Sequence, residues 1–134
     1  MNTVDDVKEI LFLEFGDETG RLVAIEGGVD INFEIKRVFY ICDVKPGVTR
    51  GEHANRHSEF CLINICGNSS VNVVDSAGNT KIFTLDAPNK GLYIPSMIWK
   101  DMYNFSQDAI LLVLSSHHYD SQEYVRDFNE FLKS

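Results

Sequence analysis

Short hydrophobic runs rich in Val, Ile, Phe and Tyr follow one another along the chain from Glu14 onward, and turn-forming residues separate them. The separators include Gly27-Gly28, Pro46-Gly47 and Ala77-Gly78-Asn79. Runs of this kind favour β-strands. We expect strands over residues 22–25, 33–44, 60–67, 71–74, 81–85, 91–94, 99–104 and 110–115. Because no helical pattern of comparable strength interrupts them, the pattern predicts an all-β sandwich or jelly-roll barrel rather than a parallel α/β sheet.

The C-terminus departs from this pattern. Tyr124, Phe128 and the pair Phe131-Leu132 recur at helical spacing, and Asp120-Ser121-Gln122-Glu123 has the form of a capping box. These features predict a short helix over residues 120–132 that packs on the barrel.

Length and charge limit the classes of function. A chain of 134 residues can bury one hydrophobic core, so we expect a single domain over residues 1–134. It has no stretch near the ~20 apolar residues of a membrane span and no basic N-terminal region typical of a secretory signal, so we expect a cytoplasmic protein without a membrane partner. The net charge of −8 argues against binding to nucleic acid. An anionic ligand would depend on individual basic residues, of which the candidates are Arg21, Arg37, Arg50 and Lys100.

Several familiar catalytic templates are absent from the sequence. The three cysteines Cys42, Cys61 and Cys66 lie in hydrophobic runs without the spacing of a metal site or a disulfide framework. Buried free thiols are the simplest interpretation. The chain also has no Gly-rich phosphate loop and no Gly-x-Ser-x-Gly nucleophile elbow.

The densest group of polar side chains is the segment Arg50-Gly51-Glu52-His53-Ala54-Asn55-Arg56-His57. Side chains alternate in an extended segment, so His53 and Asn55 should project to one face and share a cavity. His53 is the histidine best placed to act as an acid or base, although a structural role stays open on this pattern alone. The other histidines fall at turn or loop positions, where we expect exposure: His57, His117 and His118.

Five segments carry a resemblance to a known family. They are Lys36-Arg37-Val38-Phe39-Tyr40-Ile41, the Arg50-Gly51-Glu52-His53-Ala54 motif, residues 83–95 (FTLDAPNKGLYIP), Ile98-Trp99 with Met102-Tyr103, and residues 120–132. In all of them the chain resembles the bacterial sugar 3,4-ketoisomerases of deoxyaminosugar pathways. The resemblance covers the chain from Leu13 to Leu132.

This resemblance implies a cupin-type jelly-roll barrel that works without a metal or other cofactor, as a homodimer that exchanges N-terminal strands. It implies a dTDP-linked ketosugar as substrate: dTDP-4-keto-6-deoxy-D-glucose would be converted to a dTDP-3-keto-6-deoxyhexose. The chemistry would be removal of a proton beside a ketone, formation of an enediol-type intermediate and reprotonation of the neighbouring carbon.

The resemblance also implies roles for individual residues. In the family the motif reads Arg-Gly-x-His-Ala-His, and His53 matches its first histidine, the general base and proton shuttle. Arg50 and Tyr40 would position or polarise the substrate. Arg37 is a candidate for contact with the diphosphate, and a structural salt bridge would explain it equally well.

Three positions depart from the family's pattern. Asn55 replaces the second histidine, so it can form hydrogen bonds to substrate but cannot titrate, and Phe60 stands where some members have Gln. Lys100 replaces a His or Arg, and it could orient the sugar or supply a proton near C4. A basic group there resembles members that keep the glucose configuration at C4. A lysine that extends along the barrel edge is the alternative interpretation.

Two other functions stay open at this point. A nucleotide-sugar-binding cupin that has lost catalysis would explain the changes at Asn55 and Phe60. A metal-dependent cupin oxygenase is disfavoured, because only His53 and Glu59 remain as ligands and neither an amide nor an ammonium group binds transition metals well.

Overall fold

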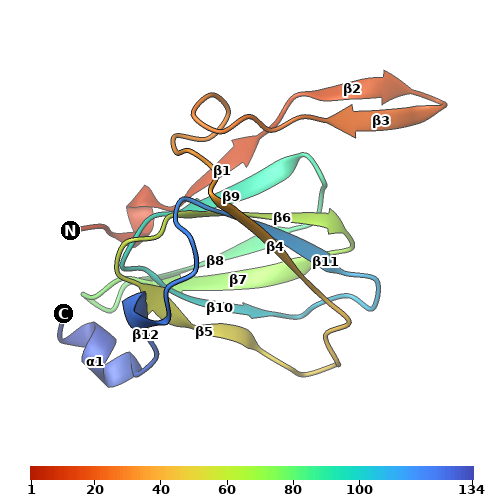
Figure 1. Ribbon diagram of the computed structural model, residues 1–134. Coiled ribbons are helices and arrows are strands. Elements are labelled where there is room, and N and C mark those ends of the chain that lie inside the picture. Colours follow the sequence, from red (N-terminus) through yellow and green to blue (C-terminus); the bar gives the residue numbers. More distant parts are fainter.

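Two antiparallel five-stranded sheets face each other in the computed structural model, which describes residues 1–134 (Figure 1). The first sheet has the order β1 (Lys8–Leu11), β9 (Lys90–Ile94), β6 (Phe60–Cys66), β11 (Ile110–Ser115) and β4 (Arg37–Cys42). The second has the order β12 (Tyr124–Val125), β5 (Arg50–Asn55), β10 (Trp99–Tyr103), β7 (Ser69–Val74) and β8 (Thr80–Leu85). Most neighbours in both sheets are distant in sequence, as in a jelly roll. The all-β architecture predicted from the sequence is therefore confirmed.

Alternate residues of the strands fill the space between the sheets. Leu62, Leu111 and Val113 from the first sheet are buried in one cluster with Val71 and Val73 from the second. The pleat of a strand puts residues i and i+2 on the same face, which is why these spacings recur. Burial of one such side chain contributes roughly 1.5–3 kcal/mol, so this core fixes the two sheets against each other.

The predicted strands over 60–67, 71–74, 81–85, 91–94, 99–104 and 110–115 are all observed, with bounds that differ by at most two residues. The strand predicted over 33–44 is shorter, because only Arg37–Cys42 pairs with β11. Phe33 is buried in a separate hydrophobic cluster with Phe12, Ile31 and Ile63. The hydrophobic residues of this run therefore belong partly to a paired strand and partly to a loop that packs on the sheet.

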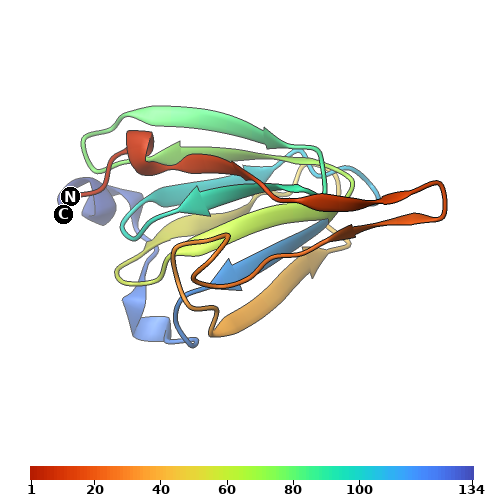
Figure 2. The ribbon, with the colours of Figure 1, turned by 90° about the horizontal axis from the view of Figure 1, so that it is seen from above.

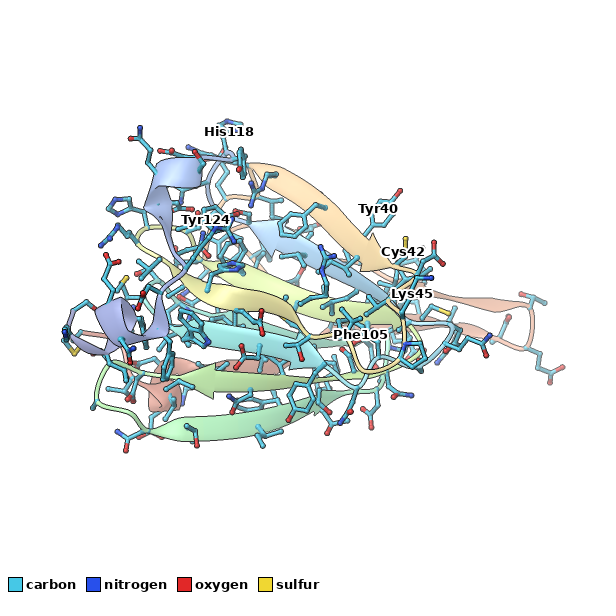
Figure 3. All side chains as sticks on the ribbon, turned by 90° about the horizontal axis from the view of Figure 1, so that it is seen from below. Tyr40, Cys42, Lys45, Phe105, His118 and Tyr124 are labelled. Carbon is cyan, nitrogen blue, oxygen red and sulfur yellow. The ribbon has the colours of Figure 1, made fainter.

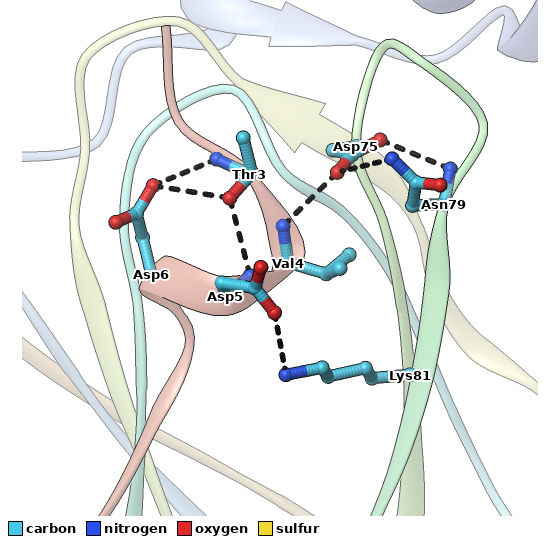
Figure 4. A network of polar contacts seen from close by, with 7 residues as sticks. All are labelled: Thr3, Val4, Asp5, Asp6, Asp75, Asn79 and Lys81. Atoms are coloured by element: carbon cyan, nitrogen blue, oxygen red, sulfur yellow. Dashed lines mark hydrogen bonds and ion pairs between the residues drawn. The ribbon is translucent and has the colours of Figure 1, made fainter.

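The N-terminus is tied to the second sheet by polar contacts (Figure 4). The backbone N–H of Val4, in the 3-10 helix η1 (Val4–Asp6), donates to a carboxylate oxygen of Asp75 at 3.1 Å. Lys81 of β8 forms an ion pair with Asp5 at 2.8 Å. Thr3 caps the helix through reciprocal hydrogen bonds with its own first turn. These contacts position β1 at the edge of the first sheet.

A hairpin of β2 (Glu14–Asp17) and β3 (Gly20–Val23) extends away from the two sheets (Figures 1 and 2). The predicted strand 22–25 corresponds to β3, whereas β1 and β2 were not predicted. The hairpin region exposes large hydrophobic side chains, since Leu13, Phe15 and Leu22 are more than half exposed. Its strands pair only with each other.

The three cysteines are free, but burial was predicted correctly only for Cys61. Cys42 and Cys66 are exposed. Cys42 lies on β4, an edge strand whose burial alternates from residue to residue, and it falls on the outer face. Cys66 is the last residue of β6, beyond the buried part of that strand.

The helix predicted over residues 120–132 is wrong in its first half. That segment contains the 3-10 turn η2 (Ser121–Glu123), the short strand β12 and the α-helix α1 (Phe128–Leu132). Asp120 caps η2 by accepting from the Gln122 N–H at 2.9 Å, but Glu123 does not complete a capping box. Pairing of β12 with β5 interrupts the helix, whereas Phe131 in α1 is fully buried, as predicted for a packed helix. None of the helices is long and apolar enough to cross a membrane.

Candidate active site

A cavity of about 300 Å³ opens between the two sheets, next to the C-terminal segment. Its wall is formed by side chains from β4, β5, β6, β10, β11 and the residues around β12. The lining residues are Phe39, Tyr40, Ile41, Arg50, Gly51, His53, Phe60, Leu62, Lys100, Met102, Val113, Tyr124 and Arg126. The cavity therefore combines an apolar floor with four basic side chains and two phenols, and no carboxylate lines it.

A β-bulge presents His53 to this cavity. His53 pairs with Lys100 across β5 and β10, whereas Gly51 pairs with the next residue, Asp101, so Glu52 is the extra residue. Gly51 has φ +87° and lies so close to β10 that an added Cβ would be 2.9 Å from the Lys100 carbonyl oxygen. Glycine is therefore required at this point, and the bulge aims the following histidine inward.

The imidazole of His53 is held as a neutral base. Its Nδ1 lies 2.9 Å from the carbonyl oxygen of Gly51, a geometry that requires Nδ1–H as donor and places the lone pair of the neutral ring on Nε2. The ring packs against the ring of Tyr124, with centroids 4.8 Å apart. Burial, followed by the positive charge of Lys100, lowers the pKa of His53 to about 4. At neutral pH, His53 is therefore ready to accept a proton.

Lys100 is a buried cation beside His53. Its side chain is only 3% exposed, and its Nζ lies 4.7 Å from the centroid of the Phe60 ring. Nζ donates to Oδ1 of Asn55 at 3.2 Å. Burial lowers the pKa of Lys100 to about 7, against the opposing effect of the Glu123 charge. Lys100 can therefore gain or lose a proton near neutral pH.

Asn55 lies behind Lys100 rather than in the wall of the cavity. It is 1% exposed, and its Nδ2 donates to Oε1 of Glu123 at 3.0 Å. The expectation that His53 and Asn55 share a cavity thus holds for the histidine only, because Lys100 separates the amide from the open space. Asn55 therefore adjoins the site from behind, where it contacts Lys100 and also acts on the pKa of His53.

Glu123 is an ionised carboxylate in a nearly buried position. It accepts from the backbone N–H groups of His57 and Ser58, at 3.1 and 3.0 Å, and from the Ser58 hydroxyl. Burial acts to raise the pKa of Glu123, but the hydrogen bonds from Ser58, Asn55 and His57 outweigh it and hold that pKa below its usual range.

Arg50 and Tyr40 are among the residues that line the cavity, but the side chain of Tyr40 is 66% exposed and points outward from β4 (Figure 3). Arg37 does not line it. Its guanidinium group packs over the rings of Phe39 and Tyr119, at 4.8 and 5.4 Å, and donates to the Tyr124 hydroxyl at 3.4 Å. Arg37 forms no salt bridge, so its structural role is aromatic packing.

Sequence reasoning missed three residues of the site, Glu123, Tyr124 and Arg126. Tyr124 and Arg126 line the cavity, and the Arg126 guanidinium lies 4.8 Å from the centroid of the Tyr124 ring. The helical spacing of Tyr124 with Phe128 concealed these roles. A two-residue strand such as β12 leaves no periodic signal in a sequence.

The remaining histidines and the second candidate metal ligand lie away from the cavity. His57 is exposed, and His117 and His118 are in the exposed loop after β11, where Figure 3 labels His118. Glu59 accepts a hydrogen bond from the Tyr93 hydroxyl at 2.5 Å and does not line the cavity. The chain has no group of three or more His, Cys, Asp or Glu side chains arranged to hold a metal ion.

The chain is similar to known proteins over nearly its whole length. The TDP-4-oxo-6-deoxy-alpha-D-glucose-3,4-oxoisomerase of Aneurinibacillus thermoaerophilus is 42% identical over 127 residues, 94% of this chain and 90% of that protein. A solved 3,4-ketoisomerase from Helicobacter canadensis is 42% identical, with a TM-score of 0.91 and 96% of each chain covered. A mutant of the 3,4-ketoisomerase QdtA from Thermoanaerobacterium thermosaccharolyticum, in complex with TDP-4-keto-6-deoxyglucose, is 35% identical, with a TM-score of 0.92 and coverage of 96% of this chain and 92% of that chain.

These likenesses extend over nearly the whole chain, and the cupin-type jelly roll predicted from the sequence is confirmed by them. The family described as FdtA: WxcM-like, C-terminal, matches residues 5–134. The chain therefore belongs to this family, and its resemblance to the sugar 3,4-ketoisomerases is confirmed.

Proposed function

We propose that this protein is a metal-independent isomerase that converts dTDP-4-keto-6-deoxy-D-glucose to a dTDP-3-keto-6-deoxyhexose. The observation that carries the proposal is the neutral imidazole of His53, with its lone pair on Nε2, beside the titratable ammonium group of Lys100 in one cavity. The relatives support the substrate class, since one is named for this oxoisomerase activity and another was solved with the 4-ketosugar nucleotide.

The reaction begins at C3 of the sugar, next to the C4 ketone. His53 takes the proton from C3, the electrons of the broken C–H bond form a C3–C4 double bond, and the ketone oxygen takes up a proton to give an enediol. The O3 proton then leaves, a ketone forms at C3, and the double-bond electrons take a proton at C4. The product is an isomer of the substrate, so no oxidant or reductant is consumed.

Lys100 suits two parts of this sequence. Its ammonium group can stabilise negative charge on the C4 oxygen as the enediol forms, and it can donate a proton there because its pKa is about 7. We expect a glucose-configured product. In that ring the C3 and C4 hydrogens lie on opposite faces, so a donor other than His53 must protonate C4. Lys100, which has given its proton to the C4 oxygen, can take up the proton that leaves O3 and deliver it to C4.

The remaining cavity residues provide contacts for the rest of the substrate. Arg50 and Arg126 both line the cavity and place positive charge where a diphosphate would have to pass. A contact of Tyr40 with the substrate stays a prediction, because its side chain is exposed on the outer face of β4. Asn55 accepts a hydrogen bond from Lys100 on the side away from the cavity. For Arg37 we infer an indirect contribution through its hydrogen bond to Tyr124, and direct contact with the diphosphate stays a prediction.

The proposal includes a homodimer in the cytoplasm. A hairpin that exposes Leu13, Phe15 and Leu22 to solvent and pairs with neither sheet supports exchange of this arm with a second copy. The sheet edge at β4 also exposes Val38 and Tyr40. The cytoplasmic location rests on the sequence alone and stays a prediction.

Turnover of purified dTDP-4-keto-6-deoxyglucose tests the proposal. Appearance of a 3-keto isomer that depends on His53 would support it. A protein that binds the nucleotide sugar without converting it would instead be a binding cupin, the alternative suggested by Asn55. That alternative is weakened by the position of Asn55 behind Lys100, since its amide replaces no group in the cavity wall.

A further inference from the structure

The cavity contains more positive charge than its lining can balance. Lys100 shares it with Arg50 and Arg126, and none of the lining residues is acidic. A buried ammonium group in such surroundings should lose its proton, because burial and neighbouring cations both favour the neutral amine. Any group that favours the charged form of Lys100 must therefore lie outside the cavity wall.

Asn55 and Glu123 form a chain of hydrogen bonds, here called the relay, to the side of Lys100 that faces away from the cavity. Nζ of Lys100 donates to Oδ1 of Asn55 at 3.2 Å, and Nδ2 of the same amide donates to Oε1 of Glu123 at 3.0 Å. All three side chains are at most 5% exposed. An amide can donate on one side and accept on the other, so its orientation here is set by the carboxylate.

We infer that Glu123 is a positioning residue of the isomerase: its carboxylate orients the Asn55 amide toward Lys100 and keeps the Lys100 ammonium group charged and in place. This inference rests on the proposed function and deepens it. The carboxylate of Glu123 is itself fixed, because it accepts from two backbone N–H groups and from Ser58. The strand β12, which directly follows Glu123, pairs with β5 and holds the backbone in place.

Asn55 thus has a role that does not require titration. Its amide cannot gain or lose a proton near neutral pH. In this chain, the amide transmits the orientation set by Glu123, and Lys100 supplies the titratable group.

Other charged and titratable groups face Lys100 and must be distinguished from Glu123. From the remaining elements around the cavity they are Tyr40 of β4, Arg50 and His53 of β5, and Tyr124 and Arg126 of the C-terminal segment. On β7, the residue paired with Lys100 is the apolar Val73. The negative charge that raises the pKa of Lys100 therefore comes from Glu123.

Titration of Lys100 by NMR tests the inference without any assumption about turnover. The lysine side chains would be labelled with ¹³C, and the Lys100 signal identified by its loss in Lys100→Met. In Glu123→Gln the midpoint should move to lower pH by roughly one unit. The matched control is Glu130→Gln, which removes an exposed carboxylate paired with Arg56 and should leave the midpoint unchanged.

Kinetics of the same variants complete the test. Glu123→Gln should lower kcat about 10-fold or more at pH 7 and shift the basic limb of the pH profile to lower pH, with little change in KM.

If Glu123→Gln does not fold, Asn55→Ala breaks the relay from the other side and should lower the same midpoint of the Lys100 titration. An unchanged Lys100 midpoint in the folded variants would overturn the inference. Absence of turnover in the wild-type protein would instead overturn the proposed function and leave the titration result standing.

Discussion

His53 and Lys100 are direct partners in the β5–β10 ladder, so an imidazole and an ammonium group lie side by side in one cavity. The positive charge of Lys100 favours the neutral form of His53. The pKa of His53 is lowered to about 4 by burial and by Lys100, and burial lowers that of Lys100 to about 7. Near neutral pH one of them is ready to accept a proton while the other can still donate one.

Replacement of His53 should remove turnover without removing binding. The change His53→Asn keeps a polar side chain of similar size but eliminates the base, so kcat should fall by about 10²–10⁴-fold. The dissociation constant for dTDP, measured by calorimetry, should change little. The matched control is His118→Asn, in the exposed loop after β11, which should behave as wild type. Equal activity of the two variants would exclude His53 as the base.

The pH dependence of kcat/KM should follow the two groups. Activity should rise as pH increases through about 4, because His53 must lose its proton to act as a base. It should fall as pH increases through about 7, because Lys100 must keep its proton to act as a donor. Steady-state rates across this range check the prediction. A rate that keeps increasing above pH 8 would contradict the assignment of Lys100 as the acid.

Lys100 should reduce the stability of the folded protein. Substitution of this buried cation in Lys100→Met should raise the free energy of unfolding by about 1–3 kcal/mol at pH 7, while activity falls. Urea unfolding measures the change, and the exposed Lys133→Met provides the control. A loss of stability in Lys100→Met would mean that the relay to Asn55 and Glu123 contributes more than the burial of charge costs.

The same variant gives a pH signature of stability. The folded-state pKa of Lys100, about 7, is below its ordinary value of 10.5. Between these values the unfolded chain binds a proton that the folded protein lacks, so stability should rise with pH across this window. The contribution of Lys100 is up to about 1.4 kcal/mol per pH unit and should be absent from Lys100→Met.

The exposed hairpin should be needed for dimer formation. Sedimentation of the wild-type protein at micromolar concentration should show a dimer. The double change Phe15→Glu and Leu22→Glu places charge on the hydrophobic arm and should shift the population toward monomer. The control is the single change Ile82→Glu on the exposed face of β8, another exposed hydrophobic residue remote from the hairpin. A wild-type monomer would remove the homodimer from the proposal.

The sequence predicted most of the strands and the residue at the centre of the site, because both leave local signals. Continuous apolar runs such as 60–67 and 110–115 indicate strands that are buried on both faces. The Arg50-Gly51-Glu52-His53 motif identified His53, although the bulge at Glu52 that aims it inward could be seen only in the ladder with β10.

The parts that were missed depend on contacts between distant residues. Glu123 was predicted as part of a capping box, but it turns inward to Asn55 and Ser58, more than 60 positions away in the chain. Its neighbour Tyr124 has the spacing of a helix and yet pairs with β5. Tertiary pairing overrides local propensity in such a short segment, and no periodic pattern reveals it.

Conversion of dTDP-4-keto-6-deoxyglucose in deuterated water, followed by NMR of the sugar ring, tests the central claim most directly. The account predicts a 3-keto product with deuterium at C4, because the proton removed from C3 by His53 exchanges with solvent and a second group protonates C4. It predicts the glucose configuration at C4 in the wild-type protein and loss of that product in Lys100→Met. Binding of the substrate without exchange at C3 or C4 would contradict it and identify a protein that binds nucleotide sugars without isomerising them.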